Sequence, residues 1–266
     1  MARKSVMISY GMGKFIAEFL TGAFGSIVFM FYETEVGLAA GYAALATILY
    51  SLWNAINDPI IGYITNKAAP FSKKLGRRFP WIVLGLVCCS VFFLLIFSVP
   101  RSWDARQHPL LVFLWMVITI CLYDGFYSLW EVNYQSIYPD KFRTQKERTT
   151  TAAVGTGVGV LGIAAGFIIP PLFFSYGVRE SYFICALVIA GVSLLASLGV
   201  GYGVFETKEM ITRFNQQKLK KGSPHFFEQM KQALRNRNLL AFVLLLFFYQ
   251  SGCMLMTASV NYVVKY

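Results

Sequence analysis

Four acidic residues lie inside apolar stretches of the sequence, where a charged side chain is costly: Glu18, Asp58, Asp124 and Glu131. An ionisable group at membrane depth usually faces a bundle interior or an aqueous cavity, where it serves transport or proton relay. A structural ion pair, or a helix boundary placed one turn away, is the competing explanation. We therefore expect these four carboxylates to mark a polar site inside an apolar bundle.

Asn54 and Asp58 are four residues apart, and this spacing puts them on one face of a helix. Asn57 is adjacent to Asp58, and Pro59 disturbs the backbone hydrogen-bond ladder at this point. Hard cations prefer such oxygen ligands. A lone carboxylate in a dry site can instead carry a proton, because burial disfavours its charged form. The spacing predicts a site for a cation and leaves H⁺ and Na⁺ as alternatives, with Asp58 as the metal ligand if the ion is Na⁺.

A second polar stripe contains Asp124, Ser128 and Glu131, because residues four and seven apart share a helix face. Asp124 is a candidate for solute binding together with Glu131. Aromatic side chains flank the carboxylates, as a sugar site requires for stacking. Since aromatics form 17% of the chain, most of them are expected to pack or to anchor the membrane interface. These flanking residues are Trp53, Tyr123, Tyr127, Trp130 and Tyr134, and Trp130 is the one we take as a solute-binding candidate.

The elements that carry these residues are predicted to be membrane helices. The chain is 56% hydrophobic and 14% charged, whereas an average soluble domain has roughly a quarter charged residues. A spanning helix needs about 20 mostly apolar residues. The sequence therefore predicts an all-α membrane protein of about seven transmembrane helices, at residues 7–31, 37–65, 80–100, 109–138, 151–175, 182–204 and 239–262.

The distribution of Lys and Arg predicts the topology and explains the net charge of +11. Basic residues concentrate at the amino terminus and in every second loop, while the opposite loops hold few of them. By the positive-inside rule, the amino terminus is expected in the cytoplasm of a multi-pass protein of the plasma membrane. The charge needs no nucleic-acid partner. Lys14 is the exception, since it lies within the first predicted helix.

The predicted helices group into three parts. Residues 1–204 form an amino-terminal six-helix bundle, 205–238 a cytoplasmic middle loop, and 239–266 the first helix of an incomplete carboxyl-terminal bundle. Within the loop, Pro224 to Leu234 has apolar residues near helical spacing. That pattern predicts either an amphipathic helix at the membrane interface or a solvated charged linker.

No motif in the sequence supports an enzyme or a bound cofactor. Gly157 to Gly162 matches the dinucleotide pattern G-x-G-x-x-G, but that motif needs a preceding strand and a soluble nucleotide fold. Glycines three or four apart in an apolar helix instead permit close helix packing. The five cysteines all lie in apolar segments without metal-binding spacing, and we interpret them as small buried residues.

Several segments together resemble one transporter family. They are Trp53 to Gly62, Asn66-Lys67 and Gly76 to Trp81, then Tyr10 to Gly13 leading to Glu18, and Glu131 to Pro139 followed by the basic run Lys141 to Arg148. In these segments the chain resembles the melibiose permease-like glycoside-pentoside-hexuronide:cation symporters of the major facilitator superfamily. The resemblance covers nearly the whole chain.

The resemblance implies roles for individual residues. Glu18 and Glu131 would bind sugar hydroxyls, while Asp58 and Ser128 would belong to the cation site. Asn54 and Gln135 depart from the family pattern. Asn54 replaces a second aspartate of the sodium-coupled members, and Gln135 stands where a tryptophan is found. Arg77 and Arg78 would brace a cytoplasmic gate, with simple topogenic charge as the alternative.

The resemblance implies a secondary active transporter that moves a sugar or glycoside by cation-coupled symport and alternating access. Its partners would be a small-molecule solute and membrane lipid. Because the sequence ends just after the seventh predicted helix, we expect a partial transporter that lacks its carboxyl-terminal half and shows little active transport alone. A transporter of lipids or other organic solutes, and a non-transporting membrane assembly partner, are the alternatives.

Overall fold

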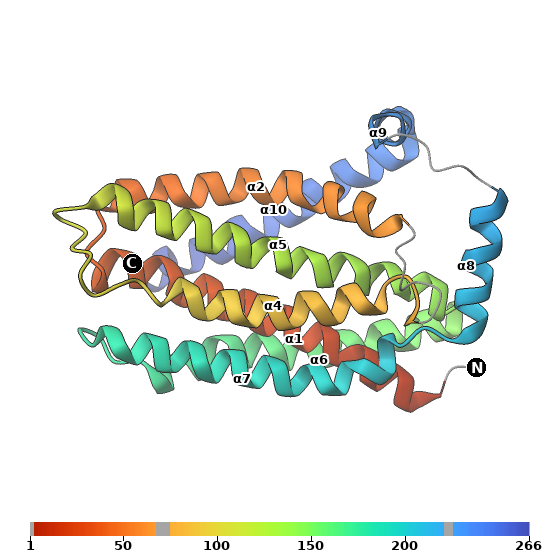
Figure 1. Cartoon of the computed structure of the whole chain (residues 1–266), viewed down its shortest axis with the longest axis horizontal. Helices are drawn as coiled ribbons and strands as arrows, with labels where there is room; N and C mark the ends of the chain where they lie inside the picture. The colour runs from red at the N-terminus through yellow and green to blue at the C-terminus, as the bar shows by residue number, and fades with distance from the viewer. Residues whose placement is uncertain (1–2, 68–74, 221–225, 266) are drawn as a thin grey trace. The chain divides into compact units, whose positions relative to one another are not determined.

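The computed structural model describes residues 3–67, 75–220 and 226–265, and the regular structure in these ranges is helical. This confirms the all-α prediction. The helices appear in chain order in Figure 1: α1 Lys4–Met30 with its π-helical extension η1 Phe31–Glu35, α2 Ala40–Asn66, α4 Phe79–Ile96, α5 Pro109–Lys141, α6 Gln145–Phe173, α7 Arg179–Val204, α8 Lys208–Lys220, α9 Phe226–Arg235 and α10 Arg237–Lys265.

The chain divides into two compact units, residues 1–217 and 218–266. In the first unit, α1 packs against α6 and α7, and α5 packs against α2 and α4. A further contact between α4 and α7 joins these two groups. Phe19, Phe93, Trp130 and Tyr182 are fully buried where the helices meet. In the second unit, α9 contacts α10.

Five of the described helices are long and apolar enough to cross a membrane: the one made of α1 with η1, and α4, α5, α6 and α7. Their outward side chains are apolar, as Leu172 and Leu198 illustrate, with 71% and 78% of their surface exposed. Helix α2 has the length of a span, but Asn54, Asn57 and Asp58 interrupt its apolar sequence. The exposed apolar surface of the five spanning-length helices suits a hydrocarbon environment rather than water.

Helix α6 starts earlier than predicted, at Gln145 instead of residue 151. The Thr144 hydroxyl accepts a hydrogen bond from the Glu147 backbone N–H at 3.2 Å, and the Glu147 carboxylate accepts one from the Thr144 N–H at 3.3 Å. This is a capping box, which satisfies two of the free donors at a helix start. The polar first turns therefore belong to the helix.

The segment predicted as a loop, residues 205–238, contains helices. α9 covers most of the stretch predicted as an amphipathic helix, and its Phe227 and Leu234 are 82% and 64% exposed. Residues 221–225 lie outside the described residues. Helix α8 was not predicted, because its sequence is polar and has no apolar run long enough to suggest an element.

The predicted glycine packing is confirmed between α1 and α6. Gly155, Gly159, Gly162 and Gly166 are buried on α6. A Cβ atom added to Gly162 would overlap the backbone oxygen of Phe15 and lie 3.0 Å from its Cα atom. The two helix backbones thus approach as closely as a missing side chain allows.

We expect Gly162→Ala to destabilise the bundle by about 1–3 kcal/mol, the usual cost of overpacking, because backbone atoms of α1 must move aside. Gly157→Ala is the matched control, since a Cβ there has no neighbour within 4 Å. Thermal melting in detergent measures both variants. Equal melting temperatures for the two would contradict the packing account.

Candidate functional site

Side chains of α2 and α5 form a polar cluster made of the buried residues Asn57, Asp124 and Ser128 and the partly buried Asn54. The Asn54 side-chain amide donates a hydrogen bond to Asp124 Oδ1 at 2.9 Å. The Asn57 amide donates to Asp124 Oδ2 at 2.6 Å and to Ser128 Oγ at 3.2 Å. Asp124, with 2% of its surface exposed, is held in place by amide donors from the neighbouring helix.

This α2–α5 cluster contains oxygen atoms that suit a hard cation. Besides the Asp124 carboxylate and the Ser128 hydroxyl, it includes the Asn57 side-chain oxygen, which is buried and has no hydrogen-bond partner in the described part of the chain. Carboxylate, amide and hydroxyl oxygens are the ligands that hard cations prefer. An unpartnered buried oxygen is costly unless something fills its place.

Asn54 and Ser128, which the sequence analysis assigns to one cation site, both lie in this cluster around Asp124, which the sequence analysis assigns to solute binding. Asn57 was not among the predicted site residues, although its spacing of three from Asn54 puts both on one face. Asp58, predicted to bind the cation, is exposed and lies outside this hydrogen-bond network.

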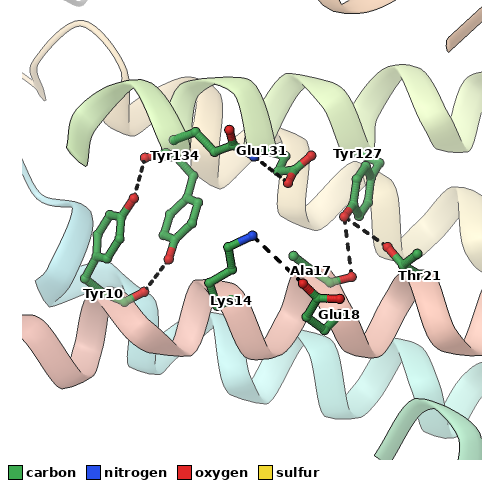
Figure 2. Close-up of polar contacts among 9 residues, drawn as sticks. Tyr10, Lys14, Ala17, Glu18, Thr21, Tyr127, Glu131 and Tyr134 are labelled. Atoms are coloured by element: carbon green, nitrogen blue, oxygen red, sulfur yellow. Dashed lines mark hydrogen bonds and ion pairs between the residues drawn. The ribbon is translucent and has the colours of Figure 1, made fainter. Parts of the chain in front are cut away.

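A second polar group lies between α1 and α5 and is shown in Figure 2. Lys14 Nζ is 3.9 Å from Glu18 Oε1, one turn along α1. On α5, Gln135 Nε2 donates a hydrogen bond to Glu131 Oε1 at 2.8 Å. We call Lys14, Glu18, Glu131 and Gln135 the α1–α5 charged site.

Lys14 is a residue whose role the sequence reasoning missed, since it was noted only as a basic residue within the first helix. Its position one turn before Glu18 was the available signal. Three of the predicted solute ligands, Glu18, Glu131 and Gln135, do come together here. The structure thus places three of the four predicted carboxylates, Glu18, Asp124 and Glu131, in two sites that share α5.

Tyrosine contacts fix α1 against α5 at the charged site (Figure 2). Tyr134 Oη donates to the Tyr10 backbone oxygen at 2.7 Å, and Tyr10 Oη donates to the Tyr134 backbone oxygen at 3.1 Å. Their rings stack with centroids 4.4 Å apart. The Tyr127 hydroxyl lies 3.2 Å from that of Thr21. Glu18 and Glu131 are therefore held on facing helices.

Trp130, a predicted solute ligand, is completely buried. Its ring packs edge-on against Tyr127, with centroids 5.5 Å apart, and is tilted against Tyr134. A Cβ at Gly85 of α4 would overlap Trp130 atoms, so α4 covers it closely. In this structure Trp130 therefore packs against Tyr127 and Tyr134 inside the bundle.

The predicted gate arginines lie where the chain enters α4. Arg77 Nη2 is 3.7 Å from Asp140 Oδ2 at the end of α5. The backbone N–H groups of Arg78 and Phe79 donate to Glu206 Oε2 at 2.8 and 3.4 Å. Glu206, which follows α7, thus caps the amino terminus of α4 and was missed by the sequence reasoning.

Burial at this junction shifts the pKa of both arginines. Burial lowers the pKa of Arg77, and it lowers the pKa of Arg78 to about 10. Gly76 has a positive φ of 90°, and a side chain there would overlap Glu206. The connection into α4 is therefore tied both to the end of α5 and to the end of α7.

The described residues contain no group of three His, Cys, Asp or Glu side chains that could hold a metal ion. Asn and Ser are not among these four residue types. A cation with oxygen ligands could therefore still bind the amide and hydroxyl oxygens of the α2–α5 cluster.

The chain is similar in sequence to known transport proteins. A family model described as MFS/sugar transport protein matches residues 9–266. The raffinose carrier protein of Pediococcus pentosaceus is 28% identical over 204 residues, which cover 73% of this chain and 30% of that protein. The lactose permease of Lactobacillus delbrueckii subsp. bulgaricus is 26% identical over 226 residues, covering 79% and 35%.

A third relative has a different solute in its name. The sodium-dependent lysophosphatidylcholine symporter 1 of Gallus gallus is 25% identical over 202 residues, which cover 63% of this chain and 37% of that protein. The chain thus spans about a third of the length of these relatives.

Proposed function

Because this chain belongs to the MFS/sugar transport protein family, we propose that it forms part of a cation-coupled symporter for a sugar or glycoside. It is an integral membrane protein, with five apolar helices of spanning length among its described residues. The observation that carries the proposal is the pair of polar sites on α5. Ser128 of the α2–α5 cluster and Glu131 of the charged site are three positions apart on α5.

The α1–α5 charged site is the proposed solute site. Glu18 and Glu131 lie on facing helices, and ionised carboxylates are strong acceptors for hydroxyl donors. Gln135 can both donate and accept. Lys14 offsets part of the negative charge, which would otherwise make two carboxylates on an apolar surface costly. This combination suits a neutral polyol better than an apolar cargo.

The α2–α5 cluster is the proposed cation site. Asp124 supplies the negative charge, while Asn57 and Ser128 supply neutral oxygen atoms. Asp58 is a proposed additional ligand, because it lies one turn after Asn54 on α2. Uptake under separate H⁺ and Na⁺ gradients distinguishes the two ions.

Coupling follows from the shared helix. Ions and solutes that both stabilise one position of α5 bind more tightly together than apart, and this coupling free energy is reciprocal. In alternating access, one bundle rocks against another around a site near the midplane. We propose that a second bundle completes the solute site. Arg77 and Arg78 would brace the gate on the cytoplasmic side of the plasma membrane.

A lipid-like solute is the second candidate, and the relative from Gallus gallus favours it because its name includes lysophosphatidylcholine. Exposed apolar side chains on α2, such as Leu52 and Ile56, could line a path for an acyl chain. The carboxylates favour a sugar, because an apolar solute would leave Glu18 and Glu131 without hydrogen-bond donors. A non-transporting assembly partner has no specific contact in its favour.

Uptake into proteoliposomes tests the proposal. The longest natural reading frame containing residues 1–266 is reconstituted and offered radiolabelled glycosides, and lysophosphatidylcholine in parallel, under separate H⁺ and Na⁺ gradients. We expect accumulation of at least one glycoside under one of the two gradients, and none when an ionophore collapses it. Accumulation of the lysolipid alone would replace the sugar assignment. Failure of every solute with a folded, inserted protein would remove the transport proposal.

A further inference from the structure

Three arginines from three separate elements converge on one small pocket at the end of the first unit. Arg77 precedes α4, Arg143 follows α5, and Arg213 lies on α8. The pocket has a volume of about 110 Å³, and Asp140, Glu206, Met210 and Phe214 complete its lining. It is distinct from the two polar sites within the bundle.

The pocket lies at the level where membrane helices end. α5 ends at Lys141, α7 ends at Val204, and α4 begins at Phe79, so the lining residues directly adjoin three candidate spans. Helix ends that leave the hydrocarbon core enter the headgroup region of the bilayer. A ligand reaching this pocket from the membrane would therefore present a lipid headgroup.

The arginine side chains are only loosely paired. Arg77 Nη2 is 3.7 Å from Asp140 Oδ2, and Arg213 Nη2 is 3.6 Å from Glu209 Oε2. Good guanidinium–carboxylate hydrogen bonds measure about 2.7–2.9 Å, so both pairs are longer than this. Arg143 donates from Nε to the Asp140 backbone oxygen at 3.5 Å, the outer limit for such a bond. Donors in this pocket thus remain for an anion.

The acidic groups of the pocket are partly engaged elsewhere. Glu206 Oε2 already accepts two backbone N–H groups at the start of α4. Asp140 is half exposed, with 52% of its side chain accessible, so solvent screens its charge. The aromatic ring of Phe214 lies 4.6 Å from the Arg77 guanidinium carbon and orients it. The three arginines outnumber the two acids that line the pocket.

We propose that this pocket binds the phosphate of an anionic lipid headgroup. Planar guanidinium groups match phosphate oxygens in pairs, and a phosphate among three of them would draw Arg143 and Arg213 together. Binding would link α8 to the ends of α4 and α5. The inference does not depend on the transport proposal, because it concerns lipid binding by a different part of the chain.

Titration of phosphatidylglycerol into the full natural protein, purified in a neutral detergent and followed by native mass spectrometry and thermal melting, tests this site. We expect phosphatidylglycerol to bind and to raise the melting temperature more than phosphatidylcholine does. Arg143→Gln and Arg213→Gln should each weaken that binding about tenfold, as expected for the loss of one charge-assisted hydrogen bond. Lys208→Gln, which removes a charge from α8 outside the pocket, should leave it unchanged.

Other results would overturn the proposal. An equal loss in Lys208→Gln would indicate diffuse attraction between charges, and equal binding of phosphatidylcholine would exclude an anionic headgroup. If inorganic phosphate at the same concentration saturated the pocket and displaced the lipid, the ligand would be free phosphate. Arg213→Lys is the control for misfolding. It keeps the charge, so it should retain part of the binding if Arg213 contacts phosphate.

Discussion

Asp124→Asn is expected to abolish gradient-driven solute accumulation while leaving solute exchange across the membrane in place. The substitution removes the negative charge at the centre of the α2–α5 cluster and leaves the size of the side chain unchanged. A hard cation loses its only buried carboxylate among the described cluster residues, and a coupling proton loses its acceptor. The driving ion would then no longer bind, although the proposed solute site of α1 and α5 would be intact.

The change also has a structural cost. In the native cluster, Asn54 and Asn57 both donate to Asp124, at 2.9 and 2.6 Å. An asparagine at 124 brings its own amide donors against one of these groups, so at least one buried donor loses its acceptor. Hydrogen bonds to a charged group contribute about 1.5–3 kcal/mol each. We therefore expect a lower melting temperature as well.

Two assays on the same proteoliposomes separate these effects. Accumulation under an ion gradient reports coupling, and counterflow of labelled against unlabelled solute reports a folded carrier that needs no gradient. Asp104→Asn makes the same chemical change in an exposed loop and should behave as wild type. Normal accumulation by Asp124→Asn would contradict the cation role of the cluster. Asp58→Asn, measured alongside, decides whether the exposed carboxylate is needed too.

Glu131→Gln is expected to weaken solute binding about 10- to 100-fold, because a charge-assisted hydrogen bond of about 1.5–3 kcal/mol becomes a neutral one or is lost. The carboxylate of Glu131 faces Glu18 across the two helices and is positioned by Gln135 at 2.8 Å. The glutamine keeps the shape of the side chain, so the packing of α5 should be unaffected.

Equilibrium binding of the best glycoside to purified protein measures this effect without any gradient. Glu180→Gln is the matched control, since Glu180 pairs with Arg101 away from the site, at the opposite end of α7 from Glu206. We expect its solute affinity to equal that of wild type. An unchanged affinity in Glu131→Gln would show that the carboxylate does not contact the solute.

Much of the helical framework could be predicted from the sequence, because long apolar runs and spaced glycines act locally. The buried approach of Gly162 to Phe15 follows from the small-residue spacing of α6. The early start of α6 was also readable, since Thr144 and Glu147 form the signature of a capping box. A prediction based only on the length of apolar runs places the start of α6 too late, because the first turns of α6 are polar.

The assembly of the α2–α5 cluster could not be predicted in the same way. Asn57 and Asp58 are adjacent, yet their side chains point about 100° apart around a helix axis. Which of them meets Asp124 depends on how α2 is rotated against α5, and that rotation is set by packing along the whole interface. Spacing alone suggested Asp58, while the structure buries Asn57.

Contacts between segments far apart in the sequence could not be predicted from the sequence either. Glu206 caps α4 from 128 residues away, and nothing near either residue indicates that pairing. Lys14 gains its place beside the carboxylates only because α5 brings Glu131 opposite α1. Sequence patterns therefore located the polar residues, and tertiary packing decided which of them share a site.

Solute-driven ion movement is the most direct test of the proposed symport, measured with the longest natural reading frame containing residues 1–266. Proteoliposomes without any ion gradient receive an inwardly directed gradient of the transported glycoside, and internal H⁺ and Na⁺ are followed with selective dyes. Because coupling is reciprocal, we predict that one of the two ions enters with the solute, and that Asp124→Asn eliminates this ion flux. Solute entry without movement of either ion would contradict cation-coupled symport.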